Sequence, residues 1–109
     1  MLCDILGGQL TSFFMAKMYL FHSTLCTPCG VVKRHFSNVK YEGIDSILMM
    51  DLTDETIDNE ANRLADKYGV PRFPLLVIVD DDGNELERYE GPTKINGHIK
   101  RLLKKYYTP

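Results

Sequence analysis

Short apolar runs and one alternating segment predict four β-strands along the chain. Residues 17–22 and 47–51 are short and rich in apolar side chains, which is typical of strands buried on both faces of a sheet. Residues 75–79 consist only of Leu, Val and Ile and are the clearest strand in the sequence. Residues 85–89 alternate between polar and apolar positions, and the turn-forming residues 80–84 before them predict a hairpin.

Apolar positions at helical spacing predict three helices. The first covers residues 28–38 and begins with a proline, which suits a first helical turn. The second ends at Gly69, and Thr53 or Asp54 is expected to cap its N-terminus. The third has one apolar face, formed by Ile95, Ile99, Leu102, Leu103 and Tyr106.

The resulting order is β-α-β-α-β-β-α, which predicts an α/β fold. A right-handed crossover makes the first two strands parallel, and the hairpin adds antiparallel strands. One four-stranded mixed sheet flanked by helices accounts for every element. We expect residues 1–16 to form an N-terminal extension and residues 17–109 to form a single domain.

Composition and charge exclude several classes of protein. The chain has 109 residues, with 13 Lys and Arg against 15 Asp and Glu, a net charge of −2. This balance gives no reason to expect a nucleic-acid groove or an anionic membrane surface as partner. No apolar stretch is long enough for a membrane helix, and the N-terminus lacks the basic region of a signal peptide. We therefore expect a cytoplasmic monomer.

Cys26-Thr27-Pro28-Cys29 lies between a predicted strand and a predicted helix. Two intervening residues on a first helical turn bring the two sulfurs close enough for a disulfide, and this context indicates a redox pair. The free N–H groups and the positive end of the helix dipole stabilise a thiolate at the first cysteine. Cys26 is therefore the predicted nucleophile, and Cys29, one turn further in, is the predicted resolving cysteine.

These cysteines have two other interpretations. They can be inert core thiols, or they can bind zinc together with His22 and His35. Cys29 and His35 are six residues apart in one helix, about 240° around its axis, and so face different sides. We therefore predict no metal site.

Other candidate residues have ordinary alternatives. His22 either lies near Cys26 and favours its thiolate when protonated, or is a partly buried residue at a strand end. Arg72 either contacts a partner protein or faces solvent. Cys3 is expected to be a free thiol in the extension. Tyr106 and Tyr107 are expected to pack at the end of the last helix rather than form a site.

Three segments resemble the thioredoxin superfamily. They are residues 21–29 around the cysteines, residues 68–75, and the hairpin that contains Asp82 and Gly83. The resemblance extends over residues 17–107. It implies a thioredoxin-like fold, a cis proline before the third strand, and a groove that binds a substrate peptide like an added strand. The substrate-binding positions that it implies are Thr27, Pro28, Phe73, Pro74 and Gly91.

The sequence also departs from the superfamily pattern. Leu25 stands where a tryptophan usually precedes the first cysteine. Leu20 and Ile47 stand where the family has a buried Asp and its Lys partner, which avoids an unpaired buried ion. The proton acceptor for Cys29 is then open, with water and His22 as alternatives. Proline as the second residue between the cysteines favours thioredoxins over glutaredoxins, whereas the length of the chain resembles a glutaredoxin.

The resemblance implies a thiol–disulfide oxidoreductase that reduces protein disulfides as a thioredoxin-like electron carrier. Such a domain binds no cofactor itself. Its electrons come from a thioredoxin reductase, which carries FAD and uses NADPH, or from glutathione. Clients of the type of ribonucleotide reductase are expected. The alternatives are a glutaredoxin-like, glutathione-dependent reductase and a binding module of this fold whose thiols are incidental.

Overall fold

The structure, a computed structural model, describes residues 16–54, 59–70 and 73–107. Its sheet contains β2 (Lys17–His22), β3 (Leu48–Asp51), β4 (Leu75–Val79) and β5 (Glu85–Glu90), in the order β3-β2-β4-β5. β2 and β3 are parallel, and the β2–β4 and β4–β5 pairs are antiparallel. The predicted four-stranded mixed sheet is confirmed.

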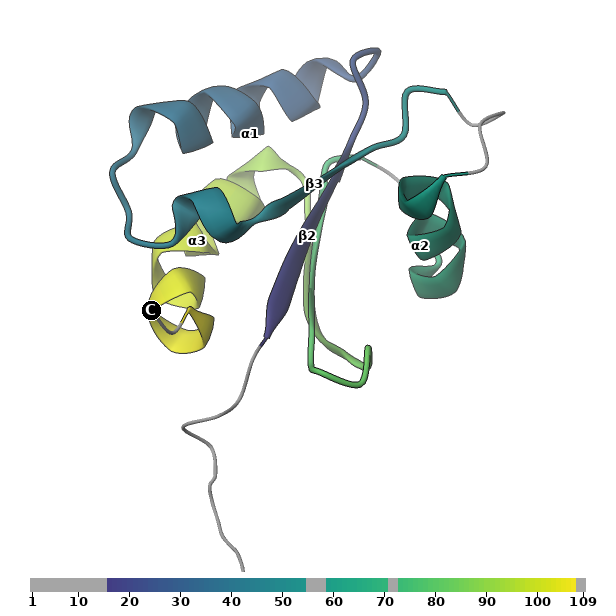
Figure 1. The fold of residues 1–109 in the computed structure, drawn as a ribbon. Coiled ribbons are helices and arrows are strands. Elements are labelled where there is room, and N and C mark those ends of the chain that lie inside the picture. The colour runs from purple at the N-terminus through teal and green to yellow at the C-terminus, as the bar shows by residue number, and fades with distance from the viewer. Residues whose placement is uncertain (1–15, 55–58, 71–72, 108–109) are drawn as a thin grey trace, which may run out of the picture.

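Helices cover both faces of this sheet. α1 (Thr27–Asn38) and α3 (Pro92–Tyr106) lie on one face, and α2 (Glu60–Tyr68) lies on the other (Figure 1). A 3₁₀ turn, η2 (Ile44–Ser46), precedes β3. The three predicted helices are therefore present, and the molecule has three layers with the sheet in the middle.

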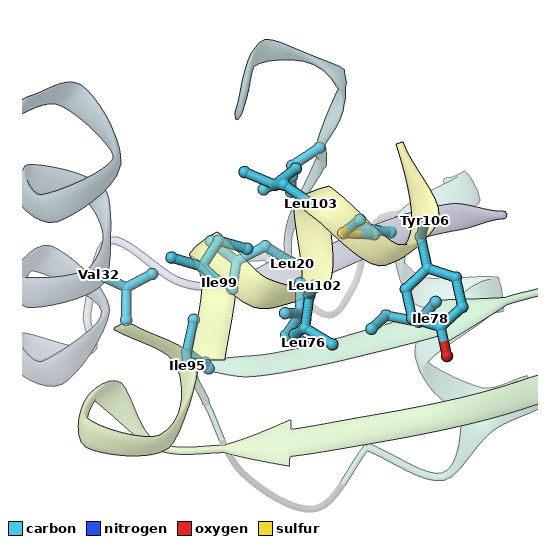
Figure 2. Packing of buried hydrophobic residues seen from close by; sticks show 11 residues of the cluster. Leu20, Val32, Leu76, Ile78, Ile95, Ile99, Leu102, Leu103 and Tyr106 are labelled. Atoms are coloured by element: carbon cyan, nitrogen blue, oxygen red, sulfur yellow. The ribbon is translucent and has the colours of Figure 1, made fainter. Parts of the chain in front are cut away.

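Successive side chains of a strand point to opposite faces of the sheet, so one hydrophobic core forms on each face. On β2, Leu20 belongs to the cluster under α1 and α3, and the next residue, Phe21, belongs to the cluster under α2. Figure 2 shows the first cluster, in which side chains of β2 and β4 meet Val32 of α1 and the apolar face of α3. All five residues of β4 are buried, because this strand is central and covered on both faces.

The prediction that residues 47–51 form a strand buried on both faces was wrong. The strand begins at Leu48, and Leu48 and Met49 are 41% and 44% exposed. Within the described residues, β3 pairs with β2 alone and so forms an edge of the sheet. Only Ile47, which directly precedes the strand, is fully packed into the core. An apolar run does not reveal whether its strand is central or at an edge.

The predicted cap of the second helix was also wrong. Asn59 caps α2, and its side-chain oxygen accepts a hydrogen bond of 2.9 Å from the backbone N–H of Asn62. Thr53 uses its hydroxyl for contacts near the cysteines instead. The other end agrees with the prediction, because Gly69 adopts a left-handed conformation that ends the helix.

Some expectations lie outside the described residues. These are Cys3 with all of the predicted extension except its last residue, and Arg72. Within the described segments, no helix is long and apolar enough to cross a bilayer.

Candidate active site

Cys26 and Cys29 form a disulfide at the N-terminus of α1, with their Cα atoms 5.3 Å apart. Cys26 is the N-cap residue, and its sulfur accepts a hydrogen bond of 3.2 Å from the backbone N–H of Cys29. Cys26 is partly exposed, whereas Cys29 is fully buried. The more exposed cysteine of the pair is thus also the one whose sulfur lies at the positive end of the helix.

The loop between β2 and α1, residues 23–25, turns tightly toward the disulfide. The side-chain oxygen of buried Ser23 accepts from the backbone N–H of Leu25, and its carbonyl accepts from the backbone N–H of Cys26. With Ser23 turned inward, the Leu25 side chain is 83% exposed directly beside Cys26. An apolar side chain presented to solvent at this point is available for contact with another molecule.

A chain of hydrogen bonds joins this loop to the end of β3. The hydroxyl of Thr53 donates to a carboxylate oxygen of Asp51, which also accepts from the backbone N–H of Thr53. The Thr53 hydroxyl in turn accepts a bond of 2.9 Å from the backbone N–H of Thr24. These two bonds from Thr53 lower the pKa of Asp51. Because β2 and β3 are parallel, their C-terminal ends meet at one edge of the sheet and bring these residues together.

A shallow pocket of about 230 Å³ opens beside Cys26. Of the residues predicted to form the site, only Cys26 and Phe73 line it. Sequence reasoning missed the other lining residues, although each of them lies within three residues of the C-terminal end of β2 or β3. They are Ser23, Leu25, Leu52 and Thr53.

The remaining predicted substrate-binding residues do not line this pocket. Thr27 and Pro28 are exposed on the first turn of α1. The Phe73–Pro74 peptide bond is cis, as the resemblance implies, and Pro74 is fully buried. The carbonyl of Pro74 accepts a hydrogen bond of 3.0 Å from the backbone N–H of Gly91, whose φ of +89° is a conformation that glycine adopts readily.

No protein-family profile and no curated protein sequence matches this chain. Solved structures do. Thioredoxin from Malassezia sympodialis aligns with a TM-score of 0.61 and 14% identity, over 85% of this chain and 76% of the other. Deadhead, a germline-specific thioredoxin of Drosophila melanogaster, gives a TM-score of 0.60 and 16% identity over 86% and 83%. Thioredoxin of Fasciola hepatica gives 0.58 and 21% over 84% and 81%.

The chain has the thioredoxin fold. The predicted α/β class and the sheet with its three helices are therefore confirmed. At these sequence identities the likeness is one of fold, so the chemistry rests on this chain's own residues.

Leu20 and Ile47, which stand where the superfamily has a buried Asp and its Lys partner, both lie in the hydrophobic core. Leu20 is fully buried and Ile47 is 6% exposed, and both belong to the cluster under α1 and α3.

His35 packs at the far end of α1, with its ring 6.3 Å from the ring of Tyr41. In the part of the chain that the structure describes, no three His, Cys, Asp or Glu residues gather as a metal site.

His22, the last residue of β2, is a buried histidine, 6% exposed. Neither ring nitrogen has a hydrogen-bond partner. Burial lowers the pKa of His22, and the positive charge of Lys33 lowers it further, while Asp51 acts in the opposite direction. The neutral ring is therefore the favoured form at neutral pH, which opposes the hypothesis of a protonated His22 that favours the Cys26 thiolate.

Proposed function

We propose that this chain is a thiol–disulfide oxidoreductase that reduces protein disulfides as a thioredoxin-like electron carrier. One observation carries the proposal. The Cys26–Cys29 disulfide lies at a helix N-terminus, with Cys26 partly exposed beside a pocket and Cys29 fully buried. A purely structural disulfide needs neither the partly exposed cysteine nor the backbone N–H that is directed at its sulfur.

The reaction uses the two cysteines in sequence. In the reduced protein, the Cys26 thiolate attacks one sulfur of a substrate disulfide, and the first substrate thiolate leaves and takes up a proton. The Cys29 thiolate then attacks the Cys26 sulfur, closes the intramolecular disulfide and releases the second substrate thiol. Two electrons pass to the substrate, and the protein is left in the oxidised state.

The surface around Cys26 suits an extended, partly apolar peptide. Leu25 and Phe73 stand on the pocket and offer apolar contact. Among the described residues, no hydrogen bond engages the backbone N–H or carbonyl of Phe73, so both groups are available to pair with a substrate strand. In this proposal Thr27 and Pro28 border the peptide, while Pro74 and Gly91 shape the backbone behind it.

For the electron donor we propose a flavin-dependent, NADPH-linked thioredoxin reductase, and we keep glutathione as the alternative. Pro28, as the second residue between the cysteines, supports the first donor through the resemblance to thioredoxins. Cytoplasmic location, a monomeric state and clients of the type of ribonucleotide reductase belong to the same proposal.

The reduction potential of the cysteine pair tests which electron donor the protein uses. A value near the ~−270 mV of thioredoxins supports the reductase, and a value above ~−230 mV favours glutathione-dependent or oxidising work.

Three proteins, the wild type and two single variants, test the activity itself. We expect the wild type to catalyse the reduction of insulin by a dithiol. Cys26→Ser should be inactive, and Cys29→Ser should accumulate a mixed disulfide between Cys26 and the substrate. Circular dichroism checks that both variants are folded. A folded wild type that reduces no protein disulfide would refute the proposal, and partner binding unchanged in a Cys26→Ser/Cys29→Ser double variant would favour the binding-module alternative.

A further inference from the structure

The resolving step needs a base for Cys29. This argument rests on the proposed function. To attack the mixed disulfide, Cys29 must first lose its thiol proton. Its side chain is fully buried, and burial away from water disfavours the charged thiolate. A group inside the protein that accepts this proton removes that obstacle.

The alternation along β2 places His22 on the sheet face that α1 covers. Met18 and Leu20 point into the cluster under α1 and α3, and His22 is the next residue of that series. It is the last residue of β2, four residues before Cys26, at the end of the strand from which the chain continues into α1.

The turn of α1 that contains Cys29 lies on this same side of the sheet (Figure 1). Cys29 and Val32 are the buried residues of α1. Lys33 follows Cys29 by one helical turn and so lies on the same side of the helix. The positive charge of Lys33 acts on the His22 ring, as the shared face of the sheet leads us to expect.

The His22 side chain has unused hydrogen-bonding capacity. Among the described residues it is the one buried side chain with two polar atoms that lack a partner, namely both ring nitrogens. Buried polar groups in proteins are almost always hydrogen-bonded, so an exception in a native fold calls for a functional reason. A buried thiol that must ionise, on the helix that covers the same face of the sheet, supplies such a reason.

We propose that His22 accepts the proton of Cys29 during the resolving step. The proton moves from the Cys29 sulfur to a ring nitrogen of His22. The Cys29 sulfur then attacks the Cys26 sulfur, a sulfur–sulfur bond forms between the two cysteines, and the bond between Cys26 and the substrate breaks. The departing substrate thiolate takes the proton from the imidazolium, and His22 returns to its neutral form.

The charges around His22 fit this role. The charged groups that act on it among the described residues are Lys33 on α1 and Asp51 at the end of β3, opposite His22 in the parallel register. Burial and Lys33 keep the pKa of His22 below its ordinary value, so the ring is neutral and can accept a proton at neutral pH. The carboxylate of Asp51 favours the imidazolium once it forms.

The experiment separates the two chemical steps. Reduced protein reacts with an excess of an aryl disulfide that releases a coloured thiolate, once when Cys26 attacks and again when Cys29 resolves. We expect His22→Gln to slow the second release by about tenfold or more and to leave the first within about twofold. His35→Gln is the matched control, because His35 is on the same helix as the cysteines but at its far end, and it should change neither step.

A measurement on the wild type does not depend on the folding of a variant. The rate of the second release should fall as the pH drops through the pKa of His22, measured independently from its ring protons by NMR. His22→Gln should lose this inflection. A second release that is equal in His22→Gln and wild type, or an inflection that differs from the NMR value, would overturn the role of His22. If the wild type gives no second release, the proposed dithiol function itself fails.

Discussion

Replacement of Glu87 by glutamine tests how α3 is held on the sheet. The Glu87 carboxylate, on β5, accepts hydrogen bonds from the hydroxyls of Tyr89 and Tyr106 and, at 3.2 Å, from the ammonium group of Lys105. Tyr106 and Lys105 belong to the last turn of α3, so one side chain joins the last strand to the C-terminal end of the last helix. These bonds, that of Tyr106 first and that of Tyr89 second, lower the pKa of Glu87 from 4.5 to about 2.

The size of the expected effect follows from this pKa. A decrease from 4.5 to about 2 corresponds to about 3 kcal/mol of preference for the ionised carboxyl in the folded state. The Glu87 side chain is 22% exposed, and the screening by solvent reduces the expected loss in Glu87→Gln to about 2 kcal/mol at pH 7. Because the folded-state pKa lies below the unfolded one, this stability is fully present above about pH 4.5 and is lost as the pH falls toward 2.

Urea unfolding of wild type and Glu87→Gln at a series of pH values from neutral to acidic is the assay. The difference in unfolding free energy should be near 2 kcal/mol at neutral pH and should shrink steadily below about pH 4.5. Glu85→Gln is the control, because Glu85 is 33% exposed, pairs with Arg88 on its own strand and, among the described residues, accepts no hydrogen bond from α3. A Glu87→Gln difference that is constant with pH, or no larger than that of Glu85→Gln, would refute the reasoning.

Three other substitutions, the first with a matched control, have expected outcomes. Gly43→Ala should lower the unfolding free energy by about 1–3 kcal/mol in thermal unfolding. Gly43 has a φ of +88°, and an added Cβ would lie 2.7 Å from Tyr107 ring carbons. The control is Gly97→Ala, in α3 with open space around it, which should not lower the unfolding free energy. Leu25→Ser should raise KM for a protein disulfide and change stability by less than about 0.5 kcal/mol, because Leu25 is 83% exposed. Thr53→Val should cost about 1–2 kcal/mol in urea unfolding, because it removes the hydroxyl that joins two loops at the site. An unchanged KM in Leu25→Ser would contradict the first of these two predictions, and an unchanged unfolding free energy in Thr53→Val would contradict the second.

Elements with a strong local pattern could be predicted from the sequence alone. β2 and β4 have the bounds that their apolar runs indicate, because a short run of buried residues specifies a strand without reference to distant neighbours. The Cys26–Cys29 disulfide was equally predictable, since the spacing of two cysteines on one helical turn is a local property. The element order then restricts the topology to very few arrangements.

The tertiary structure decided what depends on residues far apart in the chain. Leu48 and Met49 are exposed because β3 lies at an edge, which the apolar run does not encode. The Thr53 hydroxyl contacts the loop before the cysteines because the ends of two parallel strands meet, although its sequence position is typical of a helix cap. The sequence left water and His22 open as proton acceptors for Cys29, and only the packed structure shows that His22 is buried with neither ring nitrogen hydrogen-bonded. Local periodicity determines an element, whereas burial, exposure and hydrogen-bond partners arise when elements pack together.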